Sequence, residues 1–414
     1  MPTYLRDISE LDLASYVRPG DTVAWGQACA EPLTLTQALA AQRQRLGGVR
    51  CFTGISSSSA VRPEHCDFLS FMSYTAAGAN RLLARAGALT ILPAHYSELP
   101  LVPVDVIFLS LPPPRPDGTF GLGLGADYIV SLLGRARAVI AEVNDQVPDV
   151  SCDLRLRADQ LDVIVAVSRA PAEYPARAPR DIEDAIAGHV ASLVPDGATI
   201  QLGVGSMPSA VARRLCGHRD LGVHSGLITD AVAELIEAGV VTGACKSVDR
   251  GLVVTGFLIG TQRLVKLAAA SSAITLRDTR YTHDPAVLAA QTKLTAINSA
   301  TEVDLTGQVN AETAGGQYVG AVGGAADFAR AAARSPGGVP IIALPSTAGA
   351  ASRIVAQLSG PVTLARADTG VIVTEYGVAD LRGLTLAQRR ERMIAIAHPD
   401  HRNALAAAVA SDRP

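Results

Sequence analysis

The sequence predicts an α/β protein of two domains with mostly parallel sheets. Two observations carry this prediction. Short apolar segments alternate with alanine-rich segments of helical periodicity, joined by glycine turns, and this order is typical of parallel βαβ units. In addition, one pattern occurs twice: a proline-and-glycine turn, a strand, a glycine-rich loop and a helix. It opens at residues 15–39 and returns at residues 192–215, which suggests two halves of similar architecture.

The proline-rich segment RAPAEYPARAPRD, residues 169–181, separates the two halves. Proline lacks a backbone N–H and fixes φ, so this segment can continue neither a helix nor a central strand. We therefore predict an N-terminal α/β domain over residues 1–170, a linker over 171–181 and a C-terminal α/β domain over 182–414.

The individual elements follow from local patterns. An amphipathic helix is expected over residues 7–17, ended by Pro19-Gly20, and then a strand over Thr22–Trp25 and a helix over residues 33–46. Further apolar runs predict buried strands; they are VDVIFLSL, AVIAEVN and LDVIVAVS before the linker, and ATIQL, SSAITL, VPIIAL and VIVT after it.

Composition narrows the function classes. The chain has 414 residues, is 48% hydrophobic and carries a net charge of −3 without a Lys/Arg block, so neither nucleic acid nor an anionic membrane is the expected partner. No apolar run approaches the ~20 residues that span a bilayer, and the first residues show no signal-peptide pattern. Six scattered cysteines without a C-x-x-C pair favour a reduced, cytoplasmic protein with no structural metal.

Several local motifs leave their roles open. The glycine-rich loops at residues 117–127 and 316–328 run into helices and can cradle an anion, but neither follows a dinucleotide or Walker pattern. Glu375 follows the strand VIVT, where a carboxylate is a surface cap or a general base. Three arginines are candidates for binding a phosphate or carboxylate, although solvation is the default for each; they are Arg353, Arg366 and Arg382.

The run LGVHSGLITD, residues 221–230, places polar side chains at an expected strand end. His224, Ser225 and Asp230 suggest a Ser-His-Asp triad at first sight. Neighbouring residues in a strand point to opposite faces, so His224 and Ser225 would not form that relay.

Together, segments along most of the chain resemble the acetyl-CoA hydrolase/transferase family, near its 4-hydroxybutyrate CoA-transferase type. The most specific are VDLTGQVNAE (303–312) and VTEYGVADLRG (373–383), and others are LGVGSMPSAV, LGVHSGLITDAV, VGGAADFARAAARS and IAHPDHR. The resemblance implies two CoA-transferase-type α/β domains with the active site in the cleft between them. It implies that coenzyme A enters as an acyl-CoA substrate, with a small carboxylate or another acyl acceptor as partner. A homodimer is the default assembly.

The resemblance also implies site residues. The family's motif H-[ST]-E-[ML] carries a glutamate that attacks the thioester and forms an acyl-glutamyl anhydride and then a glutamyl-CoA thioester. Here the motif reads His224-Ser225-Gly226-Leu227, so the nucleophile position is vacant. Other positions match: Asn310 the residue that orients the nucleophile, Glu375 the second carboxylate, and the oxyanion and CoA-binding elements Val204, Gly205, Gly323, Gly324 and His224.

Glycine has no side chain for covalent catalysis, and four accounts stay open. Glu375 activates a water for direct hydrolysis; another residue, Ser225, Asp230 or Glu142, serves as the nucleophile; an acceptor attacks the thioester directly; or the protein binds acyl-CoA without turnover. We favour hydrolysis or direct acyl transfer, with a relocated-nucleophile CoA-transferase and a non-catalytic binder as the alternatives. The acyl pocket is expected near residues 29–34 and 54–60.

Overall fold

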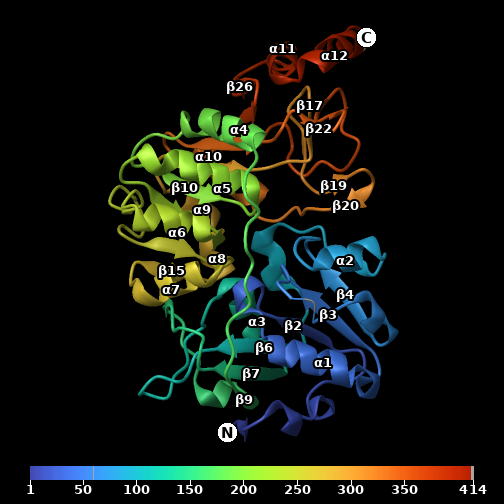
Figure 1. The fold of residues 1–414 in the computed structure, drawn as a ribbon, viewed down its shortest axis with the longest axis vertical. Helices are drawn as coiled ribbons and strands as arrows, with labels where there is room; N and C mark the ends of the chain where they lie inside the picture. The colour runs from blue at the N-terminus through green and yellow to red at the C-terminus, as the bar shows by residue number, and fades with distance from the viewer. Residues whose placement is uncertain (59, 412–414) are drawn as a thin grey trace. The chain divides into compact units, whose positions relative to one another are not determined.

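The computed structural model describes residues 1–58 and 60–411, and these residues form two compact units (Figure 1). Unit 1 comprises residues 1–175, 226–230 and 254–282; unit 2 comprises residues 176–225, 231–253 and 283–414. The first change of unit, after Pro175, lies inside the predicted linker. Because later segments also pack with unit 1, both units are discontinuous in sequence. The division into domains of residues 1–170 and 182–414 stays a prediction.

Unit 1 is built on an eight-stranded sheet in which every neighbouring pair is parallel. The central strands are buried along their whole length, which explains their unbroken apolar sequences. In sheet order the strands are β1 (Thr3–Leu5), β9 (Val163–Val167), β7 (Ala138–Asn144), β6 (Val106–Leu111), β2 (Thr22–Trp25), β3 (Val49–Thr53), β4 (Leu69–Ser73) and β5 (Leu89–Ile91).

Helix α1 (Leu33–Leu46) shows how sequence sets local structure in unit 1. Leu35 and Leu39, one helical turn apart, are fully buried in the core beside the sheet, and Gly47 ends the helix with a φ of 69° that favours glycine. The other helices of this unit are α2 (Asn80–Arg85), α3 (Asp127–Leu133), α7 (Gln262–Ala270) and α8 (Thr279–Thr282). Two short parallel pairs join β8 (Ser151–Cys152) to β15 (Ile274–Leu276), and β12 (Leu227–Ile228) to β14 (Phe257–Leu258).

The helix predicted over residues 7–17 is wrong. The segment forms two single 3₁₀ turns, Ile8–Glu10 and Leu13–Ser15. The carboxylate of Asp7 accepts a hydrogen bond from the Ser9 N–H, and that of Asp12 accepts one from the Ala14 N–H. Aspartate side chains that bond nearby backbone groups in this way compete with helix formation.

Unit 2 repeats the parallel architecture. Its strands lie in the order β26 (Gly377–Asp380), β25 (Val371–Thr374), β21 (Val339–Ala343), β16 (Leu294–Asn298), β10 (Thr199–Leu202) and β11 (Gly222–His224), and only β26 runs antiparallel to its neighbour. A small sheet joins β17 (Glu302–Asp304) to β18 (Val309–Asn310) and β24 (Ile354–Val355). The helices are α4 (Asp181–Ala191), α5 (Ser206–Arg214), α6 (Asp230–Glu237), α9 (Pro285–Ala289), α10 (Ala325–Arg334), α11 (Leu386–Ile396) and α12 (Pro399–Ser411).

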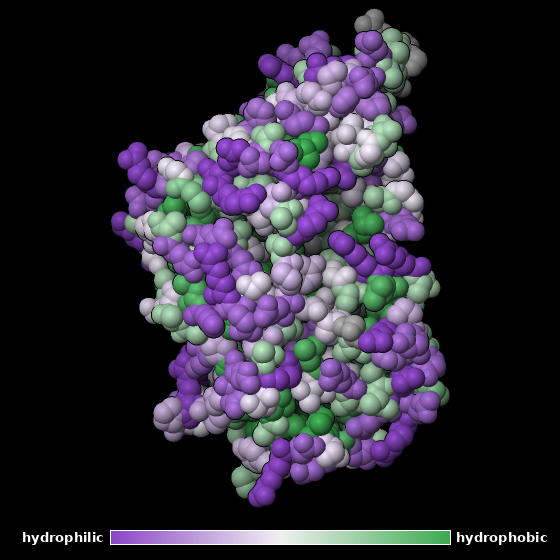
Figure 2. Space-filling model, viewed as in Figure 1, coloured by the Kyte–Doolittle hydropathy of each residue, from purple (hydrophilic) through white to green (hydrophobic). Residues whose placement is uncertain are grey.

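The large, mostly parallel sheets confirm the predicted α/β fold class. The face in Figure 2 is mainly polar, with apolar residues in separate small groups. Within residues 1–58 and 60–411, no helix has the length and apolarity needed to cross a membrane. The six cysteines are all free thiols.

Candidate active site

Five parallel strands of unit 2 end at one edge of its sheet, and most of the predicted site residues follow these strands. The register pairs Leu202 of β10 with Ile297 of β16, and Ala343 of β21 with Val373 of β25. The residues that come next therefore lie along this edge. They include Gly203–Gly205 after β10, Ser225 after β11 and Glu375 after β25, a strand that β21, β16 and β10 separate from β11. Ligands of α/β proteins bind at such carboxyl-terminal strand ends.

Two helices begin at this edge. Helix α5 follows β10 and leads to the parallel strand β11, and α10 packs against β16 and β21 before leading into β21, so both helices start where the strands end (Figure 1). Neither helix has a side-chain cap. Gly205, with a φ of 122°, precedes α5, and Gly324 precedes α10. The first N–H groups of both helices can therefore bond an anionic oxygen at this edge.

Gly324 lies against a buried histidine. A Cβ atom at this position would lie 2.7 Å from Nε2 of His283 and 3.6 Å from a ring carbon of Phe328. The two rings are in edge-to-face contact, with centroids 5.0 Å apart. Burial lowers the pKa of His283 to about 3, so the imidazole is neutral. The loop before α10 is thus packed too closely for any residue but glycine.

We expect Gly324→Ala to lower the free energy of unfolding by about 1–3 kcal/mol, because the methyl group overpacks His283 and its ring cannot move freely. Thermal unfolding measures the effect. Gly188→Ala is the control: Gly188 is exposed within α4 and a Cβ there meets nothing within 4 Å, so alanine should stabilise by about 0.5–1 kcal/mol. Equal shifts for both variants would contradict the packing argument.

Glu375 is held rigidly at the end of β25. Its Oε2 accepts a hydrogen bond from the Ser346 N–H (2.8 Å), and its Oε1 accepts one from Ser346 Oγ (2.5 Å). The residue is only partly buried. Each carboxylate oxygen has two acceptor sites, so both can accept a further bond from water or substrate. A carboxylate fixed in this way suits a general base.

Arg353 contacts Ser346, the residue that also holds Glu375. Its backbone N–H donates to the Ser346 carbonyl (2.8 Å). Burial, together with the positive charge of Arg180, lowers the pKa of Arg353, whereas Glu183 and Glu375 act in the opposite direction. The guanidinium makes no hydrogen bond or ion pair with the part of the chain that the structure describes. It is therefore available to bind a carboxylate or phosphate.

The end of β11 is buried. His224 is 0% and Ser225 2% exposed; the ring Nδ1 of His224 lies 3.2 Å from Gln291 Nε2, and Ser225 Oγ donates to the Leu202 carbonyl (3.4 Å). Lys246 supports this strand, since its Nζ donates to the Val223 and Leu252 carbonyls at 3.0 and 2.8 Å. Burial lowers the pKa of Lys246 to about 8.

Gly226 follows directly and packs with unit 1. Its carbonyl accepts a hydrogen bond from the Gly256 N–H (3.1 Å), and the Gly256 carbonyl accepts bonds from the N–H groups of Ala126 and Asp127 (2.8 and 3.1 Å). A chain of backbone bonds therefore links the Gly226 position to the start of α3.

Asn310 is fully buried and both ends of its amide are used. Its Nδ2 donates to Glu302 Oε1 (3.0 Å) and to the carbonyl and Oγ1 of Thr313 (both 3.1 Å). Its Oδ1 accepts from the N–H groups of Glu312 and Thr313. These bonds fix the turn after β18. A direct role of Asn310 toward substrate stays a prediction.

The two acidic candidates for a relocated nucleophile lie in unit 1 and are engaged there. Glu142 is 0% exposed, forms an ion pair with Arg169 and accepts from the Thr34 N–H (3.0 Å). The carboxylate of Asp230 bonds the N–H and Oγ1 of Thr261. Both arrangements favour structural roles.

A buried polar cluster follows the ends of β2 and β4 in unit 1. Gln27 Nε2 donates to Asp127 Oδ2 (2.6 Å), while Gln27 Oε1 accepts from Tyr74 OH (2.8 Å) and the Ile55 N–H (2.9 Å). Tyr96 and Tyr128 pack edge to face beside them. Burial raises the pKa of Asp127 to about 6, and nearby Asp278 adds to the effect.

This shift predicts a pH dependence of stability. The pKa of Asp127 is raised above its unfolded value near 3.8, so the folded state binds more protons than the unfolded state between about pH 4 and 6. The contribution of Asp127 to the free energy of unfolding therefore falls by about 3 kcal/mol as pH rises through this window. Asp127→Asn should lessen this fall. Urea unfolding from pH 4 to 7 measures it, with the exposed Asp145→Asn as control; a wild-type slope in Asp127→Asn would refute the assignment.

Sequence reasoning missed Ser346, the anchor of Glu375, and the Gln27–Asp127 cluster. Ser346 lies 29 residues from Glu375, and only the register of β21 with β25 brings them together. The sequence gives only a weak signal for this cluster, because Gln27 follows an apolar strand and Asp127 ends a glycine-rich loop. No group of three or more metal-ligating side chains occurs among residues 1–58 and 60–411.

Known proteins share this architecture and sequence. The N-terminal domain model of the acetyl-CoA hydrolase/transferase family matches residues 2–172, and the C-terminal domain model matches residues 260–409. The chain is 37% identical over 338 residues to the 4-hydroxybutyrate coenzyme A transferase of Clostridium kluyveri, covering 79% of each chain. An acetyl-CoA hydrolase of Eremothecium gossypii is 29% identical over 207 residues, 49% of this chain and 39% of that protein.

Solved structures agree. RipA from Yersinia pestis superposes with a TM-score of 0.92 at 33% identity, covering 98% of this chain and 97% of RipA. The 4-hydroxybutyrate CoA-transferase of Porphyromonas gingivalis gives a TM-score of 0.82 at 32% identity, with 99% and 98% covered. These matches define an acyl-CoA-processing enzyme. The chain belongs to the acetyl-CoA hydrolase/transferase family.

Proposed function

We propose that this enzyme cleaves or transfers the acyl group of an acyl-CoA by direct attack of water or an acceptor on the thioester, without an enzyme-bound glutamyl intermediate. The observation that carries the proposal is the combination of glycine at position 226 with a second carboxylate, Glu375, fixed by two hydrogen bonds to Ser346. The first removes the covalent route at that position, and the second provides a base for a different one.

The reaction balances as a hydrolysis. Glu375 accepts a proton from water as the water oxygen bonds to the thioester carbon. The tetrahedral intermediate then expels the CoA sulfur, which takes the proton back from Glu375 and leaves as the thiol, so that a carboxylic acid and the unprotonated Glu375 remain. In the transfer variant an alcohol acceptor replaces water: Glu375 accepts its hydroxyl proton, and the products are an ester and free CoA. A carboxylate acceptor attacks without a base, expels CoA and gives an anhydride.

The remaining site residues receive supporting roles in this proposal. The N–H groups beside Val204, Gly205, Gly323 and Gly324, at the starts of α5 and α10, stabilise the oxyanion, and one such donor is typically worth ~10²–10³ in rate. Arg353 binds an anionic group of substrate or acceptor. Asn310 holds the turn after β18, and His224 and Ser225 shape the end of β11.

A CoA-transferase with a relocated nucleophile is the second candidate, because a relative that covers 79% of this chain is named a CoA transferase. Ser225, Asp230 and Glu142 are each held by neighbouring groups, which argues against this route. We also propose a cytoplasmic homodimer, the commonest closed assembly for such enzymes.

A free-thiol assay with a panel of acyl-CoAs, with and without acetate, tests the proposal. Acetate-independent release of CoA supports hydrolysis. Acetate-dependent exchange together with a covalent enzyme adduct trapped by hydroxylamine would establish the transferase. Tight binding of acyl-CoA for hours without turnover would assign the protein as a binder.

A further inference from the structure

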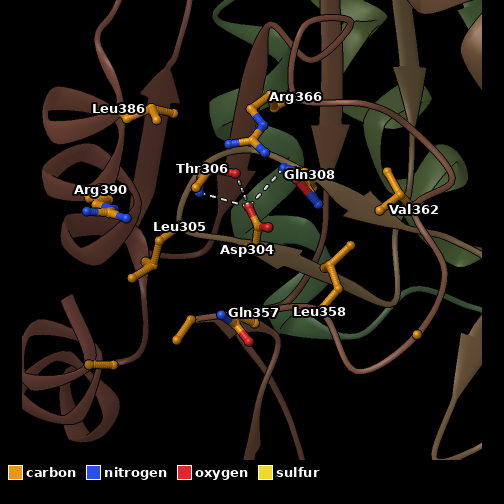
Figure 3. A pocket seen from close by; sticks show the side chains of 13 residues that line it. Asp304, Leu305, Thr306, Gln308, Gln357, Leu358, Val362, Arg366, Leu386 and Arg390 are labelled. Atoms are coloured by element: carbon orange, nitrogen blue, oxygen red, sulfur yellow. Dashed lines mark hydrogen bonds between the residues drawn. The ribbon is translucent and has the colours of Figure 1, made fainter. Parts of the chain in front are cut away.

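A cavity in unit 2 shares none of its lining residues with the candidate active site. It lies between the turn joining β17 to β18, the loop after β24, and helices α11 and α12 (Figure 3). Its volume is about 680 Å³, within the ~300–1,000 Å³ of typical small-molecule sites. Charged and aliphatic side chains both line it.

Asp304 supplies a buried acceptor. The residue is only 5% exposed, and its Oδ1 accepts three hydrogen bonds, from Thr306 N (2.8 Å), Thr306 Oγ1 (2.8 Å) and Gln308 N (2.9 Å). Its Oδ2 bonds to no residue in the described part of the chain, and the side chain faces the cavity (Figure 3). The three bonds to Oδ1 fix the carboxylate, so Oδ2 is presented in one orientation.

Arg366 supplies a cation on another wall. Its guanidinium has no hydrogen-bond or carboxylate partner within residues 1–58 and 60–411, and Figure 3 shows it turned toward the turn that holds Asp304. The backbone beneath it is anchored, because Arg389 Nη1 donates to both the Arg366 carbonyl (2.7 Å) and the Thr306 carbonyl (3.0 Å). Burial and the positive charge of Arg366 lower the pKa of Arg389.

Aliphatic side chains complete the cavity. Val362 and Leu386 are 51% and 45% exposed, Leu305 is buried and Leu358 half-buried. Exposed aliphatic groups around a hollow gain free energy when an apolar ligand covers them. The cavity therefore offers the carboxylate of Asp304, the cations of Arg366 and Arg390, and apolar side chains.

We propose that this cavity binds an α-amino acid with an apolar side chain. Its carboxylate pairs with Arg366, its ammonium group donates to Asp304 Oδ2, and its side chain covers Leu358 and Val362, which lie on the same side of Asp304 (Figure 3). A simple anion would meet the unpaired oxygen of Asp304, and a simple amine would leave Arg366 unpaired, so the zwitterion fits both groups. This binding site is independent of the proposed catalytic function.

Calorimetric titration with matched probes tests the proposal. The zwitterions L-leucine, L-methionine and L-phenylalanine are compared with 4-methylpentanoate, which is leucine without its amino group, and with 3-methylbutylamine, which lacks the carboxylate. We expect at least one zwitterion to bind and both truncated probes to bind at least about tenfold more weakly. Equal binding of a truncated probe, or no binding by any zwitterion, would overturn the proposal.

Variants locate the site. Arg366→Gln and Asp304→Asn should each weaken zwitterion binding at least about tenfold. Arg334→Gln is the matched control, because Arg334 is also exposed but lies on α10 outside the cavity, and it should bind like wild type. Asp304→Asn can also disturb the turn after β17, so the fold of this variant is checked by circular dichroism and thermal unfolding. If Asp304→Asn does not fold, the result for Arg366→Gln decides the test. Wild-type affinity in Arg366→Gln would place the ligand elsewhere.

Discussion

Glu375→Gln loses most of the acetate-independent release of CoA, with a rate about 10²–10⁴-fold below wild type. The amide keeps the shape of the side chain but cannot accept the proton of the attacking water. Glu375→Ala should show a similar loss. The measurement is the free-thiol assay at saturating acyl-CoA, because substrate binding depends mainly on other groups.

Ser346→Ala is the matched comparison. It removes the Oγ bond to Glu375 Oε1 but keeps the N–H bond to Oε2, so the loss should be smaller, about tenfold. Comparison of the two variants distinguishes the loss of the base itself from the loss of one hydrogen bond that positions it. A wild-type rate of hydrolysis in Glu375→Gln would exclude Glu375 as the base and would mean that another group activates the water.

Gly226→Glu should create acetate-dependent exchange of CoA between acyl groups. A glutamate at this position restores the family's H-S-E-L order between His224 and Leu227, directly after Ser225 at the end of β11. The introduced carboxylate can attack the thioester and form an anhydride. Hydroxylamine should trap a covalent intermediate at position 226 of this variant and give no adduct with the wild-type protein.

Gly226→Gln is the control, since it fills the same volume without a nucleophile and should give no exchange and no adduct. If Gly226→Glu yields neither exchange nor adduct while Gly226→Gln folds and binds acyl-CoA, then the missing glutamate at position 226 does not by itself explain the absence of transferase activity. The acyl pocket or acceptor site must then also differ from the transferase arrangement.

The sequence predicts much of this fold because parallel strands carry a strong local signal. The strands over Thr22–Trp25, Ala138–Asn144 and Val371–Thr374 are mainly apolar runs that are followed by glycine or polar residues, and all three form. The helix predicted over residues 7–17 does not form because the side chains of two aspartates accept hydrogen bonds from nearby backbone N–H groups. The spacing of hydrophobic residues carries no information about this competition.

The candidate site was less accessible to prediction. Glycine at 226 and glutamate at 375 can be read from the sequence, but the bonds that position them join distant segments. Ser346 reaches Glu375 only because β21 pairs with β25. The pKa of Asp127 depends on its complete burial among Gln27 and three tyrosines, and burial is a property of tertiary packing.

The discontinuity of the two units affects biosynthesis. A ribosome that has released only residues 1–175 has produced the whole eight-stranded sheet of unit 1, but neither Gly256 nor Gly260, whose carbonyls accept from Asp127 and Tyr174. Unit 1 can close only after Thr282 emerges, when most of the chain has been synthesised. Until then the backbone groups and side chains that these later segments cover stay exposed on the nascent N-terminal half, which favours chaperone binding and aggregation.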